Sequence, residues 1–77
     1  MDSVQRQQLI IALINQRIDE DLGDPLPGGV DEDWEEEAKT IKTLYRETLE
    51  NLGNADLWAC AEVKDQKSLS RFLEKWI

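Results

Sequence analysis

GDPLPGGV, residues 23–30, stands between two long amphipathic stretches and decides how this chain folds. Two prolines and three glycines in eight residues cannot continue a helix. Gly23 fits the left-handed backbone position that follows a helix C-terminus. The segment is long enough to bring a second helix back along the first, so it predicts an antiparallel helical hairpin.

The stretch before this loop predicts a first helix over about residues 3–22, capped by Asp2 or Ser3. Leu9 and Leu13 widen its apolar face well beyond the usual stripe of about 100°. So wide a face predicts either cover by other helices of the same chain or a self-association seam. The second alternative makes Leu9 and Leu13 candidates for an apolar interface in a homodimer. The rest of this face consists of Val4, Ile10, Ile11, Ile14, Ile18 and Leu22.

The stretch after the loop predicts a second helix over about residues 32–52, ended by Gly53. Asp33 and Glu36 have the spacing of a capping box, and Val30 is a candidate hydrophobic staple if Asp31 is the cap. Apolar and small residues then recur at helical spacing. Their stripe consists of Trp34, Ala38, Ile41, Leu44, Tyr45, Thr48, Leu49 and Leu52.

The C-terminal part predicts two short helices, over about residues 55–64 and 67–76. Asn54 is the expected cap of the first, and a break near Asp65 is favoured over one bent helix. Leu69, Phe72, Leu73 and Trp76 follow the i, i+3, i+4, i+7 rule. With no strand alternation in the sequence, the expected fold is an all-α bundle of three to four helices, with residues 1–77 as a single domain.

The chain contains no histidine and only one cysteine, Cys60. The commonest general base and the commonest metal ligand are therefore missing, and the thiol has no histidine to activate it. We expect Cys60 to be a small buried hydrophobe. From these absences we expect no enzymatic activity, no catalytic residue, no bound metal and no cofactor.

A lone cysteine suits a reducing compartment, and no stretch approaches the roughly 18–20 apolar residues of a membrane span. The apolar run Leu9–Ile14 is short and has no cleavage site after it. These features predict a soluble, cytoplasmic protein that does not contact membranes.

Negative charge is concentrated in one segment. Between Ile18 and Ala38 there are ten carboxylates and no Lys or Arg, whereas the rest of the chain has nine Lys or Arg and seven Asp or Glu. The net charge of −8 therefore forms one acidic pole. Its members, with the tryptophan inside it, are Asp19, Glu20, Asp21, Asp24, Asp31, Glu32, Asp33, Trp34, Glu35, Glu36 and Glu37.

Three interpretations of this acidic segment stand side by side. It is a solvated helix start with acids placed for the helix dipole, a contact surface for a basic partner, or a calcium loop. The calcium interpretation is the weakest, because an EF-hand register starting at Asp19 puts Gly23 at position 5, Asp24 at position 6 and Val30 at position 12.

We favour a small non-enzymatic module that regulates or inhibits a larger protein by docking these acids on a basic surface, with Trp34 as the apolar anchor. Dense carboxylates can also imitate the phosphates that a nucleic-acid-binding protein recognises. A small chain with no histidine and one acidic pole is typical of phage-type inhibitors. The chain itself is not expected to bind nucleic acid, because its overall field opposes the mildly basic last helix. That helix region carries Lys64, Lys67, Arg71 and Lys75.

The first alternative is an adaptor or assembly subunit that binds through an apolar helix face. A homodimer formed through that face is one version of it. Trp58 and Trp76 join Leu9 and Leu13 as candidates for that face, because tryptophan is enriched at binding hot spots. Under this alternative the acids serve only solubility.

The remote alternative is a metal-dependent helical hydrolase. Glu47-x-x-Glu50 and Glu62-x-x-Asp65 resemble, in spacing, the paired motifs of all-α nucleotide pyrophosphatases, and that resemblance implies a magnesium site. Helix geometry opposes it, because Glu47 and Glu50 point nearly opposite the apolar stripe of their helix.

Overall fold

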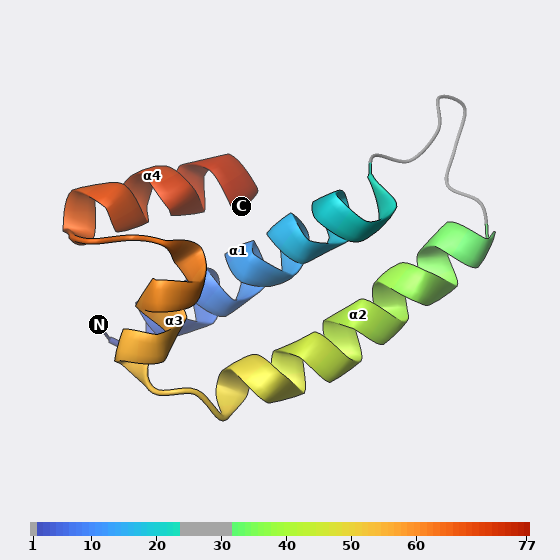
Figure 1. The fold of residues 1–77 in the computed structure, drawn as a ribbon, viewed down its shortest axis with the longest axis horizontal. Coiled ribbons are helices and arrows are strands. Elements are labelled where there is room, and N and C mark those ends of the chain that lie inside the picture. The colour runs from blue at the N-terminus through green and yellow to red at the C-terminus, as the bar shows by residue number, and fades with distance from the viewer. Residues whose placement is uncertain (1, 24–31) are drawn as a thin grey trace.

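The computed structural model describes residues 2–23 and 32–77, and in the second helix it leaves the side chains of Glu32 and Asp33 undescribed. The predictions made for Asp24, Val30 and Asp31 lie outside the described residues. Within the described ranges the chain forms four helices and no strand (Figure 1). They are α1 (Ser3–Leu22), α2 (Glu32–Glu50), α3 (Asn54–Ala61) and α4 (Gln66–Trp76). The all-α class and the antiparallel α1–α2 hairpin are confirmed.

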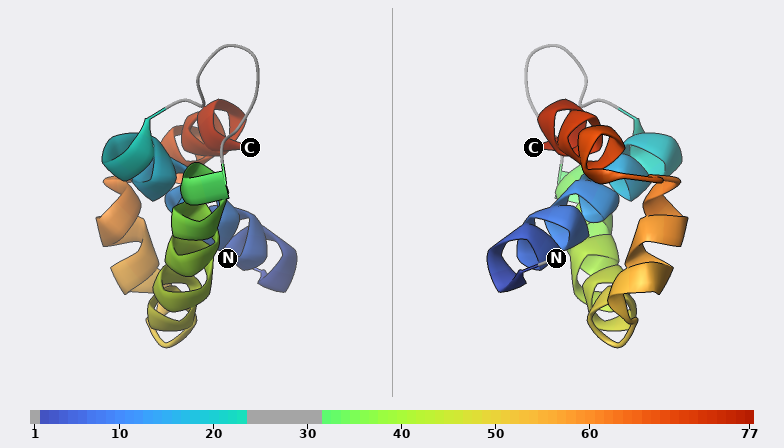
Figure 2. Two further views of the ribbon diagram at one scale, coloured as in Figure 1. Left: turned by 90° about the vertical axis from the view of Figure 1, so that its right-hand side faces the viewer. Right: turned by 90° about the vertical axis from the view of Figure 1, so that its left-hand side faces the viewer.

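Helix α1 is the centre of the fold. It packs against α2, α3 and α4, and Figure 2 shows these three helices arranged around it rather than in one layer. Leu9 is fully buried and Leu13 is 1% exposed. Of the two explanations for the wide apolar face, cover by the chain's own helices is therefore the one observed, and the self-association seam at Leu9 and Leu13 is wrong.

The core collects the inward residues of all four helices. At about 25 cal/mol per Å² of apolar surface removed from water, each fully buried leucine contributes about 1.5–3 kcal/mol. The buried cluster is Leu9, Ile10, Leu13, Ile14, Ile18, Ala38, Leu49, Leu57, Ala61, Val63 and Leu69, with Leu22, Trp34, Ile41, Tyr45, Leu52, Trp58, Phe72 and Leu73 packed against it.

Three residues assigned to apolar faces are instead exposed: Val4 at 67%, Ile11 at 41% and Leu44 at 62%. Val4 lies in the first turn of α1. Leu44 lies on α2, which packs chiefly on α1 and so has only one face covered. Periodicity locates an apolar stripe but does not show how much of its width a neighbouring helix covers.

The helix starts follow the capping rules. The Asp2 carboxylate accepts a hydrogen bond from the Gln5 backbone N–H at 2.7 Å, so Asp2 rather than Ser3 caps α1. The Asp65 carboxylate accepts one from the Ser68 N–H at 2.7 Å and caps α4. Each bond satisfies a donor that a helix start leaves without an intrahelical partner. The break near Asp65 is therefore observed.

Helix α3 differs from its prediction at both ends. Its N-cap is Gly53, and Asn54 is its first residue. It ends at Ala61 because Glu62 adopts left-handed backbone, with φ 58° and ψ 32°. The Glu62 N–H donates to the Ala59 carbonyl and the next N–H, of Val63, donates to the Trp58 carbonyl, both at 3.1 Å. These two hydrogen bonds together form a Schellman motif, which ends the helix here without a glycine.

Arg6 of α1 holds the turn between α2 and α3. Its guanidinium donates to the Asn54 Oδ1 at 2.8 Å, to the Glu50 carbonyl at 3.1 Å and to the Leu52 carbonyl at 2.6 Å. The Asn54 side chain, expected to be a helix cap, is therefore an acceptor for Arg6. A cation at the end of α2 is also favoured by the negative end of the helix dipole.

Candidate docking surface on the hairpin

The hairpin brings the end of α1 and the start of α2 together, and with them the described part of the acidic segment. All six of these carboxylate residues are exposed: Asp19, Glu20, Asp21, Glu35, Glu36 and Glu37. We call this set the acidic surface. Asp24 and Asp31 lie outside the described residues, and so do the side chains of Glu32 and Asp33.

Carboxylates from both helices converge on one surface pocket. Asp21 of α1 and Glu36 and Glu37 of α2 line it, and the other described lining residues, Leu22, Thr40 and Ile41, are neutral. None of these lining residues is Lys or Arg, so the described lining carries three carboxylates and no cation of its own. Arg17, which lies in the adjoining groove, pairs with one of the three, Asp21.

The dipole explanation accounts for only part of the acidic surface. Glu35 lies near the N-terminus of α2, where negative charge is stabilised. Asp19, Glu20 and Asp21 occupy the last turn of α1, which contains no basic residue, and at a helix C-terminus negative charge is unfavourable. Placement for the helix dipole therefore does not explain these three acids, although Asp21 also pairs with Arg17 one turn earlier in the same helix.

Trp34 closes the hairpin from inside. It is half-buried against the core, and its indole N–H donates to the Gly23 carbonyl at 3.2 Å. Gly23 itself has a φ of 69° and a ψ of −170°, a positive-φ conformation that favours glycine but not the left-handed helical conformation expected there. The indole thus links the start of α2 to the end of α1. The role of Trp34 as an anchor for a partner stays a prediction.

Arg17 is the cation nearest the acidic surface. Its Nε lies 2.9 Å from the Asp21 Oδ2, and its guanidinium carbon lies 5.7 Å from the centroid of the Tyr45 ring. The two contacts place the guanidinium between Asp21 of α1 and the ring of Tyr45 on α2. Burial raises the pKa of the Tyr45 hydroxyl, and Cys60 raises it further. The Arg17 cation lowers this pKa, and the Glu20 carboxylate raises it.

An apolar groove of about 420 Å³ continues from the acidic pocket along α2. The two depressions share Asp21, Thr40 and Ile41, so they form one surface. The exposed Leu44 lies in the groove. The remaining lining residues are Arg17, Tyr45, Thr48, Leu49, Leu52 and Cys60.

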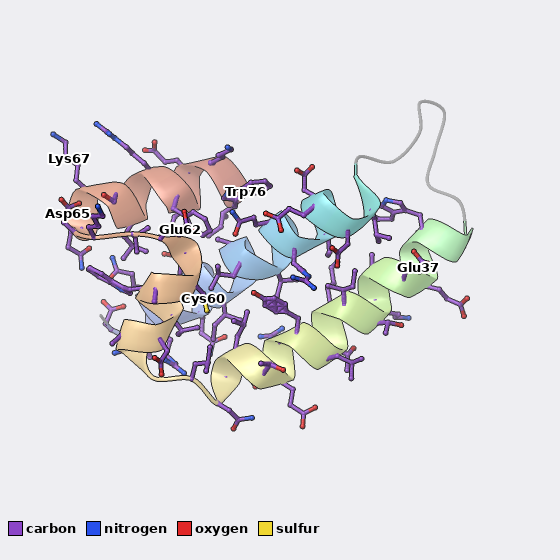
Figure 3. All side chains as sticks on the ribbon, in the orientation of Figure 1. Glu37, Cys60, Glu62, Asp65, Lys67 and Trp76 are labelled. Carbon is purple, nitrogen blue, oxygen red and sulfur yellow. The ribbon has the colours of Figure 1, made fainter. Side chains whose placement is uncertain are left out.

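The labelled Cys60 on α3 and Glu37 on α2 lie toward opposite ends of this surface (Figure 3). Cys60 is exposed, so its expected burial is wrong. Helix α3 is only eight residues long, and the neighbours that cover its inner face leave the cysteine outside.

Sequence reasoning missed the groove. The signal was present in α2, where Leu44 stands about 100° around the helix from Tyr45, so the apolar stripe is wider than one packed neighbour covers. Cys60 had no such signal, because its place beside α2 depends on the α2–α3 turn.

The other predicted interface residues do not join this surface. Leu9 and Leu13 are buried. Trp58 is half-buried against the core. Trp76 is also half-buried: its backbone carbonyl accepts a hydrogen bond from the Asn15 side chain, and the Lys75 ammonium lies 5.2 Å from its ring centroid.

The motifs that suggested magnesium do not converge. Glu47 and Glu50 are exposed on α2, and the Glu50 carboxylate pairs with the Arg46 Nε at 3.3 Å. Within residues 2–23 and 32–77, no group of three or more His, Cys, Asp or Glu side chains is arranged to hold a metal ion. In the same ranges, no helix combines the length and apolar character needed to cross a membrane.

Comparison of this chain with protein families, with characterised proteins and with solved structures finds no match.

Proposed function

We propose that this chain is a small non-enzymatic interaction module that regulates or inhibits a larger protein. It docks its acidic surface on a Lys/Arg-rich surface of that protein, of the kind that a nucleic-acid-binding protein uses for phosphates. The absence of histidine supports a role in binding rather than catalysis.

One observation carries the proposal: a single surface pocket is lined by Asp21 of α1 and by Glu36 and Glu37 of α2. The end of α1 and the start of α2 are consecutive in the chain, and the hairpin places their carboxylates on one pocket. Among the described residues that line this pocket and the adjoining groove, the one guanidinium is that of Arg17. Charge arranged in this way raises the local concentration of a cationic partner and speeds its encounter. Asp19 and Glu20 in the last turn of α1 fit the same role, since the helix dipole disfavours negative charge there.

Salt and charge removal test the proposal together. Tagged protein would be incubated with nuclease-treated lysate of the source cell, washed at low and at high salt, and the retained proteins identified by mass spectrometry. We expect a partner with a basic surface that is lost at high salt, because the screening length falls from about 10 Å at 0.1 M to about 3 Å at 1 M.

The decisive variant is Asp21→Asn with Glu36→Gln and Glu37→Gln. Three exposed ion pairs at about 0.2–1 kcal/mol each predict a loss of about 3- to 150-fold in affinity. The matched control removes three exposed carboxylates elsewhere, with Glu47→Gln, Asp56→Asn and Glu74→Gln. Equal losses for the two triple variants would mean that net charge, and not this surface, holds the partner.

A second candidate function is an adaptor or assembly subunit that binds through an apolar helix face. The observation in its favour is the 62% exposure of Leu44 within the groove. A partner retained at high salt and indifferent to the three-carboxylate variant would favour the adaptor, because apolar contacts are not screened.

A further inference from the structure

We infer that the groove along α2 receives an amphipathic helix of the partner, with its apolar side on Leu44 and its Lys/Arg-rich end on Asp21, Glu36 and Glu37. This inference rests on the proposed function, because it names the element of the partner that meets the acidic surface. A helix laid in an apolar groove is a common mode of peptide recognition.

The length and floor of the groove fit such a helix. From Glu36 to Leu49 the acidic pocket and the groove together follow α2 for about 20 Å, at about 1.5 Å per residue, and Leu52 lies just beyond the helix end. Ile41, Tyr45 and Leu52 are half-buried and form an apolar floor, and Leu44 stands above it, exposed. A helix of about four turns matches this length.

Charge decides which kind of helix fits. The acidic pocket closes one end of the groove, and Glu20 and Glu62 line a depression that shares Arg17, Tyr45 and Cys60 with the groove. Arg17 is the only cation among these lining residues, and it already pairs with Asp21. The basic residues of α2 avoid the groove: Lys42 and Arg46 line a separate depression with Ile11, Ile14 and Asn15.

A second copy of this chain is a poorer occupant. It carries the same net charge of −8 and would bring its own acidic surface to the same groove. A partner helix with a basic end instead places opposite charge on the acidic pocket while its apolar side covers Leu44.

The test uses selected peptides as probes. A displayed library of random peptides of about 16 residues would be selected on the immobilised full-length chain, and the enriched peptides measured by fluorescence anisotropy. We expect apolar residues at i, i+3 or i+4 and i+7, with Lys or Arg concentrated at one end.

Two matched pairs of variants locate the binding. Leu44→Ser should weaken the enriched peptides about 10-fold or more, while Val4→Ser, which changes an exposed apolar residue outside the groove, should not. Glu37→Gln should weaken them more than Glu35→Gln, because the two residues lie about 200° apart around α2 and only Glu37 lines the pocket. Circular dichroism confirms that each variant remains helical.

The other outcomes overturn the inference in distinguishable ways. If no basic amphipathic peptide is enriched, or if Leu44→Ser binds the peptides as tightly as the parent, the groove is not the site, and acidic docking is judged separately by the lysate experiment. If Leu44→Ser weakens binding but Glu37→Gln and salt do not, the groove binds an apolar helix without a basic end and the inference fails, while the lysate experiment alone decides the proposed function. If sedimentation shows a dimer that Leu44→Ser abolishes, the occupant is a second copy.

Discussion

Removing the Arg6 guanidinium should weaken the fold more than removing any other arginine. Arg6 bonds Asn54, Glu50 and Leu52 at once and so ties α1 to the end of α2 and the start of α3. Since α2 packs chiefly on α1, this clamp is a main link between α2 and α3. In Arg6→Ala, the Glu50 and Leu52 carbonyls lose a charged donor at the negative end of the α2 dipole.

The magnitude follows from hydrogen bonds made by a charged group, which contribute about 1.5–3 kcal/mol. Because the clamp is only partly buried, we expect a loss of about 2 kcal/mol. A domain of this size has a free energy of unfolding of about 4–12 kcal/mol, so the loss is a large share of it. It corresponds to a fall in Tm of about 8–16 °C.

Urea and thermal unfolding followed by circular dichroism at 222 nm measure the loss. Arg71→Ala, at an exposed arginine of α4, removes the same charge and should change the free energy of unfolding by less than about 0.5 kcal/mol. Arg6→Lys keeps the charge but not the planar fork, so it should recover only part of the loss. Equal stability of the Arg6→Ala and Arg71→Ala variants would refute the clamp.

Four further predictions follow from single residues. Glu62→Gly should raise the free energy of unfolding by about 0.5–1 kcal/mol and Glu62→Ala should not, because only glycine relieves the left-handed backbone; urea melts compare them. The pKa of Asp65 is lowered from 3.8, chiefly by the hydrogen bond from the Ser68 backbone and next by the one from the Ser68 side chain. The stability that this cap contributes is therefore present above about pH 4 and lost as pH falls through the folded pKa. In a pH series, the free energy of unfolding of Asp65→Asn should fall less steeply in acid than that of the parent. Tyr45 is the only tyrosine, so absorbance at 295 nm should show its pKa above 10 in the folded chain and near 10 in denaturant. Because the folded chain favours the neutral phenol, the free energy of unfolding falls as pH rises through the folded pKa. A folded pKa at or below 10 would contradict the burial of this side chain. Leu13→Ala should cost about 2.7–5 kcal/mol and unfold much of the population, and a variant that stays folded with only a changed oligomeric state would restore the surface role.

Much of the fold was predictable because its signals are local. The span of α1, its end at Gly23, the Asp2 cap and the break at Asp65 depend on residues within a turn or two of each feature. The acidic pole was also readable, since ten carboxylates in one segment need no tertiary information.

The failures share a cause, which is that they depend on which helix lies where. Asn54 has the chemistry of a cap, but Arg6, 48 residues earlier, takes its carboxamide oxygen. Cys60 and Leu44 have the chemistry of core residues but face the groove, because α2 and α3 do not close over it. Glu62 ends α3 with a backbone conformation that is rare for a non-glycine residue and so carries no local sequence signal.

The exposed thiol of Cys60 has a practical consequence for anyone handling this protein. In air, two chains can join through an Sγ–Sγ bond, and because Cys60 lines the groove, each chain would then obstruct the other's opening. An oxidised preparation would run as a covalent pair and fail to capture peptides, which would imitate both a dimer and an inactive variant. A reductant, or Cys60→Ser, removes that artefact, and the same thiol in its reduced form offers a single attachment point for a dye at the mouth of the groove.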